Sequence, residues 1–227
     1  MGEDENAIIR CHELTKFYPV GEGVFALQNV HLTVYPGEFV LLNGPSGSGK
    51  TTLLNILGGI DRPSHGEVIM RGRKFSRMTE DGLALLRRKD LGFVFQFFNL
   101  IPELTAWENI AFPLKIAGVP PDEIRQRVSV LLSRLHLDGR ANHYPLELSG
   151  GEQQRVAIGR ALAHQPSLVL ADEPTGNLDS KNAREVMELF RDFNRRDGQT
   201  FIVASHASEF AEYATRVVSL RDGRIVE

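Results

Sequence analysis

The chain has 227 residues, which is enough for one large or two small domains with a hydrophobic core of their own. Its 26 Lys and Arg side chains nearly balance 29 Asp and Glu, and the net charge of -3 excludes an overall basic field for nucleic acid or an anionic membrane. A single cysteine, Cys11, excludes an internal disulfide, and the acidic first residues lack the apolar segment of a secretion signal. No apolar run approaches the roughly 20 residues of a membrane span, so we expect a cytosolic chain that needs another chain for any membrane-spanning part.

The first part of the chain is predicted to be mainly β-structure. Four segments rich in apolar residues predict strands, at residues 8–14, 25–35, 38–42 and 67–72. One helix interrupts these strands. It begins near Lys50, where Leu53, Leu54 and Leu57 recur at helical spacing.

The middle of the chain is predicted to be mostly helical. A short strand at residues 91–95 is followed by helical character from residue 103 to about 165, with clear helices over 122–137 and 151–164. The apolar stripe of the first of these helices consists of Ile124, Val128, Leu131, Leu132 and Leu135. We therefore expect a helical subdomain at about residues 97–165, in which core packing is favoured for Trp107 and Phe112.

The last part alternates again between strands and helices. The pattern predicts, in order, a strand, a helix, a strand, a short helix and a hairpin, at residues 167–171, 180–196, 200–204, 208–214 and Asp222-Gly223. Such alternation with continuous apolar strands is typical of an α/β protein with a mainly parallel, helix-covered sheet. We expect one domain over residues 1–227, with a core formed by about 1–96 and 166–227.

A phosphate-binding loop is predicted between the strand at 38–42 and the helix at Lys50. Its sequence matches two glycines separated by four residues and followed by Lys and Thr. Glycines let backbone N–H groups surround an anion, Lys50 bridges the outer phosphates, and the Thr51 hydroxyl binds Mg²⁺. The predicted nucleotide-binding residues here are Gly44, Pro45, Ser46, Gly47, Ser48, Gly49, Lys50, Thr51 and Thr52.

Two carboxylates are expected beside this loop. Asp172 and Glu173 end the apolar strand at 167–171, and an open parallel sheet binds its ligand beyond the carboxyl ends of its strands. Asp172 is predicted to hold Mg²⁺ through its water shell, because Mg²⁺ takes few protein ligands. Glu173 is predicted to accept a proton from an attacking water.

Residues 148–155, Leu-Ser-Gly-Gly-Glu-Gln-Gln-Arg, resemble the signature of ATP-binding-cassette (ABC) ATPases. The order of the other motifs is also similar to that family, over about residues 8–226. The resemblance implies a P-loop NTPase cassette with an N-terminal antiparallel β subdomain and an inserted helical signature subdomain. It also implies a head-to-tail dimer, in which Ser149, Gly150 and Gly151 of one copy close on the phosphate held by Lys50 of the other.

Further roles follow from the same resemblance. Tyr18 is similar to the aromatic residue that stacks on adenine, with Phe17 as the rival position. Gln96 resembles the glutamine that senses the γ-phosphate and Mg²⁺, and Asp179 the aspartate that communicates across the dimer. His206 resembles the histidine that contacts the γ-phosphate and orients Glu173; the other histidines, including His65, His136 and His143, lack ligand spacing.

The expected function is Mg²⁺-dependent ATP hydrolysis that drives a separate membrane permease. ATP is favoured over GTP because no guanine-reading Asn-Lys-x-Asp motif is present. Within the family the chain resembles the lipoprotein-releasing and macrolide-export subgroup, which places it at the cytoplasmic face of the inner (plasma) membrane. The alternatives are an importer ATPase and a cell-division-type regulatory ATPase with low turnover; nucleic acid is not an expected partner.

Overall fold

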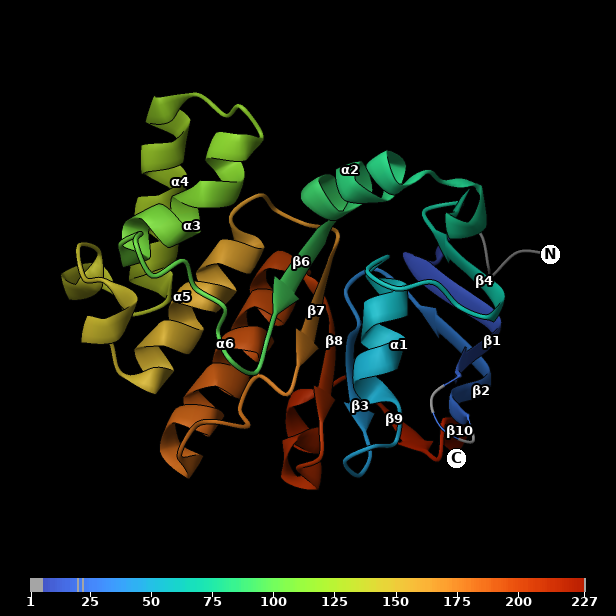
Figure 1. Cartoon of the computed structure of the whole chain (residues 1–227). Helices are drawn as coiled ribbons and strands as arrows, with labels where there is room; N and C mark the ends of the chain where they lie inside the picture. The colour runs from blue at the N-terminus through green and yellow to red at the C-terminus, as the bar shows by residue number, and fades with distance from the viewer. Residues whose placement is uncertain (1–5, 20, 22, 227) are drawn as a thin grey trace.

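The computed structural model describes residues 6–19, 21 and 23–226, and these residues form two sheets (Figure 1). The larger sheet has the strand order β10-β9-β3-β8-β7-β6. Its strands are β3 (Phe39–Asn43), β6 (Leu91–Val94), β7 (Leu168–Asp172), β8 (Thr200–Ser205), β9 (Arg216–Arg221) and β10 (Arg224–Val226). All neighbours in it are parallel except β10, which pairs antiparallel with β9 through the predicted turn at Asp222-Gly223.

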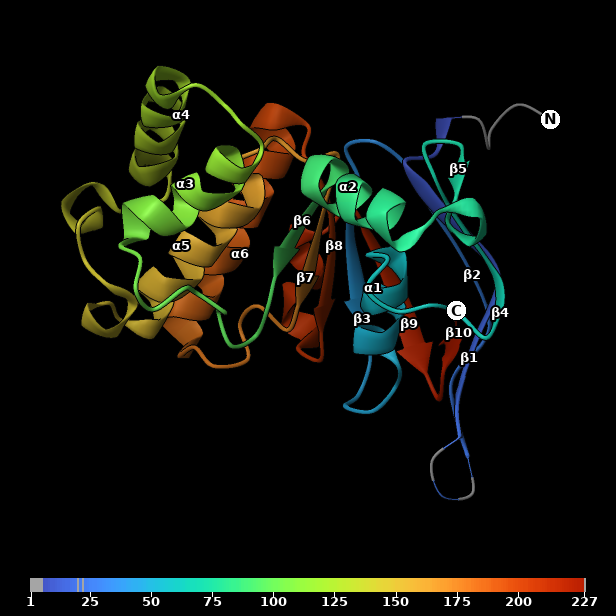
Figure 2. The ribbon, with the colours of Figure 1, turned by 45° about the horizontal axis from the view of Figure 1, so that its top comes forward.

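The smaller sheet is antiparallel and has the order β2-β1-β4-β5. Its strands are β1 (Ile9–Tyr18), β2 (Val24–Val34), β4 (His65–Met70) and β5 (Arg73–Lys74). Figure 2 shows this sheet at one end of the molecule, beside α1 (Lys50–Leu57). The predicted α/β class, mainly parallel core and N-terminal antiparallel sheet are confirmed; the acidic residues 1–5 lie outside the described part.

Three helices gather at the other end of the molecule: α3 (Ala106–Ile116), α4 (Pro121–Arg134) and α5 (Gly150–Leu162) (Figure 1). Two more helices flank the larger sheet, α2 (Glu80–Asp90) and α6 (Ser180–Asp197). Short 3-10 segments complete the described chain, at Phe75–Arg77, Asp138–Arg140, Pro145–Glu147 and Ser208–Tyr213.

The larger sheet is buried on both faces. Successive residues of β3 alternate between two hydrophobic cores: Phe39 and Leu41 pack with α5 and α6, whereas Val40 and Leu42 pack with α1 and the smaller sheet. All four side chains are fully buried. A strand covered on both faces explains the continuous apolar run in the sequence.

Several elements differ from the sequence prediction. Helix α2 was not predicted; it buries only Leu83 and Leu86, so its apolar pattern is weak, and the Thr79 side chain caps it by accepting from Gly82 N. Strand β1 continues to Tyr18 because the irregular pairing around Glu13, which has φ 50°, interrupts the alternation without ending the strand. The short helix predicted at residues 208–214 is present as a 3-10 helix, Ser208–Tyr213.

The apolar segment after β6 is only partly buried. Trp107 packs against the core as expected, but Phe112 is 37% exposed, which corrects its predicted placement in the core. Phe97 is 73% exposed. In the part of the chain that the structure describes, no helix has the length and apolar character needed to cross a membrane.

Candidate functional site

The loop between β3 and α1 is shaped by two glycines that other residues could not replace without displacement. A Cβ atom on Gly44 would lie 2.1 Å from the carbonyl oxygen of Leu220 on β9. Gly49 has φ 105°, and a Cβ atom there would lie 2.4 Å from the carbonyl oxygen of Ala26. The neighbouring strands therefore set the position of the loop backbone. The Ser48 hydroxyl is buried within it with no hydrogen-bond partner.

Lys50 lies at the start of α1 and is buried beneath this loop. Its Nζ donates to the carbonyl oxygens of Gly44, at 2.7 Å, and Pro45, at 3.0 Å. The same atom lies 3.4 Å from Glu173 Oε1. The lysine thus connects the phosphate loop with the acidic end of β7, two motifs that are far apart in the sequence.

Glu173 leaves the sheet with an unusual backbone conformation. Strand β7 ends at Asp172, and Glu173 has φ 45°, a left-handed conformation that a non-glycine residue adopts at a cost. Its N–H donates to the carbonyl oxygen of Ala204 on β8, at 3.0 Å. Its carboxylate lies between Lys50 and His206. Lys50 Nζ is close to Oε1, and His206 Nδ1 is 2.9 Å from Oε2.

Asp172, the last residue of β7, is half-buried at the same edge of the sheet. Burial raises the pKa of its carboxyl group, and the charge of Glu173 adds to this shift, while a hydrogen bond with Thr51 and the charge of Lys50 oppose it. Asp172 Oδ1 is buried with no partner. A buried carboxylate oxygen beside a threonine hydroxyl suits a hard divalent cation such as Mg²⁺.

Gln96 follows β6 and contacts the loop after Glu173. Its backbone oxygen accepts a hydrogen bond from Asn177 Nδ2 at 2.9 Å. A Cβ atom on Gly176 would lie only 2.8 Å from Gln96 Nε2, so the two loops are tightly packed. Lys50, Asp172, Glu173, His206 and Gln96 are thereby connected at the carboxyl ends of neighbouring strands.

The signature residues begin helix α5 and form a capping box. Ser149 Oγ accepts from Glu152 N at 3.3 Å, and the Glu152 carboxylate accepts from Ser149 N at 2.8 Å. Arg140 Nε donates to the other carboxylate oxygen at 2.7 Å. Although burial opposes the shift, the hydrogen bonds from Arg140 and Ser149 lower the pKa of Glu152 to about 2.

The N-termini of α5 and α6 are in contact. Asp179 caps α6, accepting from Asn182 N at 2.9 Å, and also accepts from Asn182 Nδ2. A Cβ atom on Gly151 would lie 2.3 Å from Asn182 Oδ1. The structure therefore brings the predicted residues Gly151 and Asp179 together through Asn182, a residue that the sequence analysis missed because no motif marks it.

The signature and the phosphate loop are separated within one chain. Figures 1 and 2 both show strands β6, β7, β8 and β3 between α5 and α1. The contacts of Ser149 and Gly151 are with Glu152 and Asn182 and not with the phosphate loop. A single copy thus does not bring Ser149, Gly150 and Gly151 to Lys50.

Tyr18 lies beside the phosphate-loop helix, whereas Phe17 does not. The Tyr18 hydroxyl donates to Asp61 Oδ2 at 2.8 Å, and Asp61 lies in the turn that follows α1. The ring of Phe17 instead packs against Phe25, with ring centroids 4.9 Å apart, and both rings are substantially exposed. This geometry favours Tyr18 over Phe17 as the residue that contacts a bound base.

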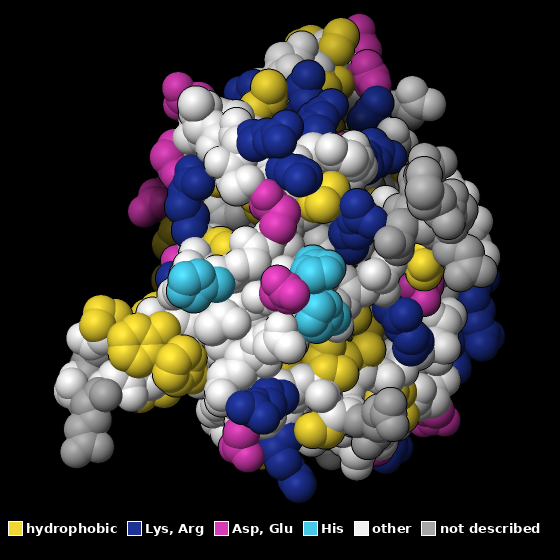
Figure 3. All heavy atoms as spheres, turned by 90° about the vertical axis from the view of Figure 1, so that its right-hand side faces the viewer, with side chains coloured by type: hydrophobic (Ala, Val, Ile, Leu, Met, Phe, Trp, Pro, Cys, Tyr) yellow, Lys and Arg dark blue, Asp and Glu magenta, His cyan; other side chains and the backbone are white. Residues whose placement is uncertain are grey.

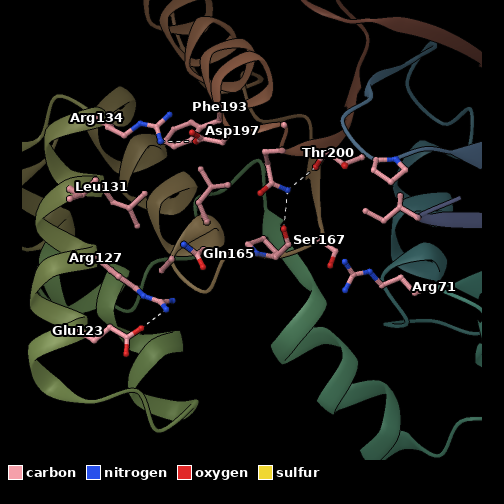
Figure 4. Close-up of a pocket in the computed structure, with 18 of the residues that line it drawn as sticks. Arg71, Glu123, Arg127, Leu131, Arg134, Gln165, Ser167, Phe193, Asp197 and Thr200 are labelled. Atoms are coloured by element: carbon pink, nitrogen blue, oxygen red, sulfur yellow. Dashed lines mark hydrogen bonds and ion pairs between the residues drawn. The ribbon is translucent and has the colours of Figure 1, made fainter. Parts of the chain in front are cut away.

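A cleft with charged side chains lies away from this site. A cleft of about 1220 Å³ opens between α4 and the opposite edge of the larger sheet, where Arg127 pairs with Glu123 and Arg134 with Asp197 (Figure 4). Its cations are neutralised, and it lies at the amino ends of β7 and β8, away from the usual ligand edge.

Histidines gather around an acidic side chain on the outer face of the smaller sheet (Figure 3). His12 and His31 are in edge-to-face contact at 4.7 Å, and His12 Nδ1 lies 3.9 Å from Glu13. Within residues 6–19, 21 and 23–226, no group of three or more His, Cys, Asp and Glu side chains is arranged to hold a metal ion.

Comparison with known proteins identifies the family. The family model of the ABC transporter matches residues 27–176. The chain belongs to the ABC transporter family. An uncharacterized ABC transporter ATP-binding protein of Thermotoga maritima is 50% identical over 219 residues, which are 96% of this chain and 93% of that protein. The lipoprotein-releasing system ATP-binding protein LolD of Pseudomonas syringae pv. tomato is 46% identical over 224 residues, 98% of this chain and 99% of that protein.

Solved ABC structures have the same fold. The ATP-binding cassette MJ0796, in a dimeric post-hydrolysis state bound to ADP and Pi, is 44% identical and superposes with a TM-score of 0.89 over 96% of this chain and 97% of that one. CbiO1 from Clostridium perfringens, part of the transporter complex cbiONQ, is 29% identical with a TM-score of 0.88 over 98% and 88% of the two chains. The chain is an ABC ATPase, as the motifs predicted.

Proposed function

We propose that this ABC ATPase works as an ATP-dependent dimer that drives a separate membrane permease of the lipoprotein-release or macrolide-export type. Identity of 46% with LolD over nearly the whole of both chains supports this subgroup. The dimeric MJ0796 cassettes support the assembly. The ATPase then acts at the cytoplasmic face of the inner membrane, held there by its permease.

The arrangement of Glu173 between Lys50 and His206 carries the proposed chemistry. Water attacks the γ-phosphorus of ATP, the bond to the β–γ bridging oxygen breaks, and ADP and phosphate form. Glu173 accepts the proton of the attacking water, and His206 orients the Glu173 carboxylate. Lys50 exchanges its contact with Glu173 for the outer phosphates, which frees the carboxylate for the water.

The proposed metal site consists of Thr51, Asp172 and Gln96. The unpartnered, buried Asp172 Oδ1 beside the Thr51 hydroxyl fits a Mg²⁺ ion that retains most of its waters. When bound, Mg²⁺ supplies neutralisation of the charge on the outer phosphates. Gln96 couples this place to the helical subdomain, proposed to span about residues 97–165, because it packs on Gly176.

Each nucleotide is proposed to lie between two copies of the chain. Residues 44–52 of one copy hold the phosphates, and Ser149, Gly150 and Gly151 of the second copy complete the site from the far side. Asp179, which contacts Gly151 through Asn182, would report closure of the dimer. Tyr18 stacks on adenine beside Thr52.

The proposed permease contact is the exposed apolar surface beside Gln96. Phe97 directly follows Gln96 and is 73% exposed, and later in the same apolar segment of the sequence Phe112 and Ile116 of α3 are also exposed. A permease segment bound to Phe97 would affect Gln96 directly, because the two residues are neighbours in the chain. Such a surface connects the nucleotide site with the membrane partner.

Reconstitution of the chain with its candidate permease tests this proposal. We expect the permease to co-purify and to raise the ATPase rate, and Phe97→Asp to abolish both effects. Val130→Asp is the matched control, because Val130 is exposed on α4, away from Gln96. An unchanged ATPase rate with the permease, or activation only with an extracytoplasmic binding protein, would favour the regulatory or the importer alternative.

A further inference from the structure

The ring and the hydroxyl group of Tyr18 are each held by other side chains. Lys16 Nζ lies 4.8 Å from the centroid of the Tyr18 ring, so an ammonium group covers one side of that ring. The Tyr18 hydroxyl donates to Asp61 Oδ2 at 2.8 Å. Lys16 Nζ in turn donates to Asp61 Oδ1 at 2.7 Å, which closes a triangle of three side chains.

Asp61 is itself fixed to the phosphate-loop helix. The chain turns back at Gly59, with φ 63°, after α1 ends. The N–H groups of Ile60 and Asp61 both donate to the carbonyl oxygen of Asn55, at 2.8 and 3.2 Å. Asp61 is therefore a rigid acceptor, presented to Tyr18 by the same helix that begins with Lys50.

Burial and polar neighbours both act on the Tyr18 hydroxyl. Its pKa is raised by burial and by the hydrogen bond to Asp61, and a hydrogen bond with Thr52 opposes this rise. A phenol has one proton to donate and lone pairs to accept. The one proton of the Tyr18 hydroxyl goes to Asp61 Oδ2, so this hydrogen bond fixes the direction of the phenol group.

We propose that Lys16 and Asp61 are positioning residues that fix the Tyr18 ring for the nucleotide base and join it to the phosphate-loop helix through Asp61. This inference rests on the proposed stacking of Tyr18 on adenine. Tyr18 is the last residue of β1 and is only half-buried, so these side-chain contacts restrict the rotation of its ring. Lys16 covers one face of the ring, and the base takes the other face.

The test compares a ligand with a base and a ligand without one. Binding of ADP and of inorganic pyrophosphate is measured by calorimetry for the wild type, Asp61→Ala, Lys16→Met and Tyr18→Ala. We expect Asp61→Ala and Lys16→Met to weaken ADP binding about three- to tenfold, as expected for the loss of one or two net hydrogen bonds, while pyrophosphate binding changes by less than about twofold. The exposed Asp81, on α2, gives the control Asp81→Ala, which leaves both affinities unchanged.

A double variant separates positioning from other roles. In the Tyr18→Ala background, Asp61→Ala should cause no further loss of ADP affinity, because the Tyr18 ring that Asp61 positions is already absent. A further loss there, an equal loss for pyrophosphate, or unchanged ADP binding by Asp61→Ala alone would each overturn the inference. Unchanged ADP binding by Tyr18→Ala would instead overturn the proposed base stacking. Thermal unfolding of each variant checks that it folds.

Discussion

Glu173, the residue proposed to accept the proton of the attacking water, has a backbone conformation that is unusual for a non-glycine residue. Glu173 is held in a left-handed conformation by its hydrogen bond to Ala204, so its carboxylate points away from the strand toward Lys50 and His206. Strain of this kind persists only where the surrounding structure imposes it. Here β7 and β8 impose it.

Replacement of Glu173 tests its role directly. Glu173→Gln should lower the steady-state ATPase rate by about 10² to 10⁴, because a general base is lost while the side chain keeps its shape. ATP binding, measured by equilibrium titration, should be retained. Glu188→Gln, the same change on the exposed face of α6, is the control. Near-normal phosphate release by Glu173→Gln would contradict the assignment.

A substitution of Gly44 tests whether the phosphate loop has room for one added Cβ atom. In Gly44→Ala the added Cβ would lie 2.1 Å from the Leu220 carbonyl oxygen, so the loop or β9 must move. We expect a loss of about 1–3 kcal/mol in the free energy of unfolding, typical of overpacking, together with weaker nucleotide binding. Gly139→Ala, which meets no atom within 4 Å, should leave the unfolding midpoint unchanged. Equal midpoints for the two variants would show that the loop is not constrained as described.

Among the elements, α5 begins with a cap that involves the charge of one side chain, Glu152. Glu152 satisfies the N–H and the hydroxyl of Ser149 and pairs with Arg140. The structure gives the Glu152 carboxylate a clear role as a cap. The Ser149 hydroxyl donates to it, so a phosphate at α5 would compete with Glu152 for that proton.

The pH dependence of stability reports on this cap. A carboxyl whose pKa falls from 4.5 to about 2 on folding stabilises the folded state above pH 4.5, and this contribution is lost as the pH falls toward 2. Glu152→Ala should lower the free energy of unfolding at neutral pH by about 1 kcal/mol, the usual value of a cap, and Glu152→Gln by less. In urea titrations the difference between wild type and Glu152→Ala should shrink below pH 4.5. A difference independent of pH would contradict the capping role.

The elements that carry the nucleotide motifs could be predicted from the sequence, because strong local signals define them. Residues 38–42 and the helix at Lys50 have continuous apolar character and helical spacing, and both are confirmed. Helix α2 was missed because it buries only two leucines, and the end of β1 because of the irregularity at Glu13.

Contacts within the site were less predictable than the motifs. The phosphate-loop pattern, the end of an apolar strand and the family resemblance predicted Lys50, Glu173 and His206 as residues of one site, and in the structure Glu173 contacts both of the others. Lys16, Asp61 and Asn182 belong to no motif, and only the folded chain brings them to Tyr18 and Gly151. Side-chain partners across separate loops depend on tertiary geometry, which local sequence patterns do not encode.

For the whole molecule, the separation of the two nucleotide motifs is the decisive feature. One copy presents the phosphate loop on one side of the larger sheet and the signature helix on the other (Figure 1). If each site is shared between two copies, a defect in either motif inactivates the sites to which that copy contributes it. The central claim is therefore that the working unit is a dimer with composite sites.

Mixing two inactive variants tests this claim most directly. Lys50→Ala lacks the phosphate-loop lysine, and Ser149→Arg blocks the signature, so each variant alone should be without measurable ATPase activity. A mixed dimer contains one site with an intact Lys50 from one copy and an intact Ser149 from the other. We expect ATPase activity to reappear on mixing and to rise with protein concentration. A mixture as inactive as its components, although both variants fold, would contradict a dimer with composite sites.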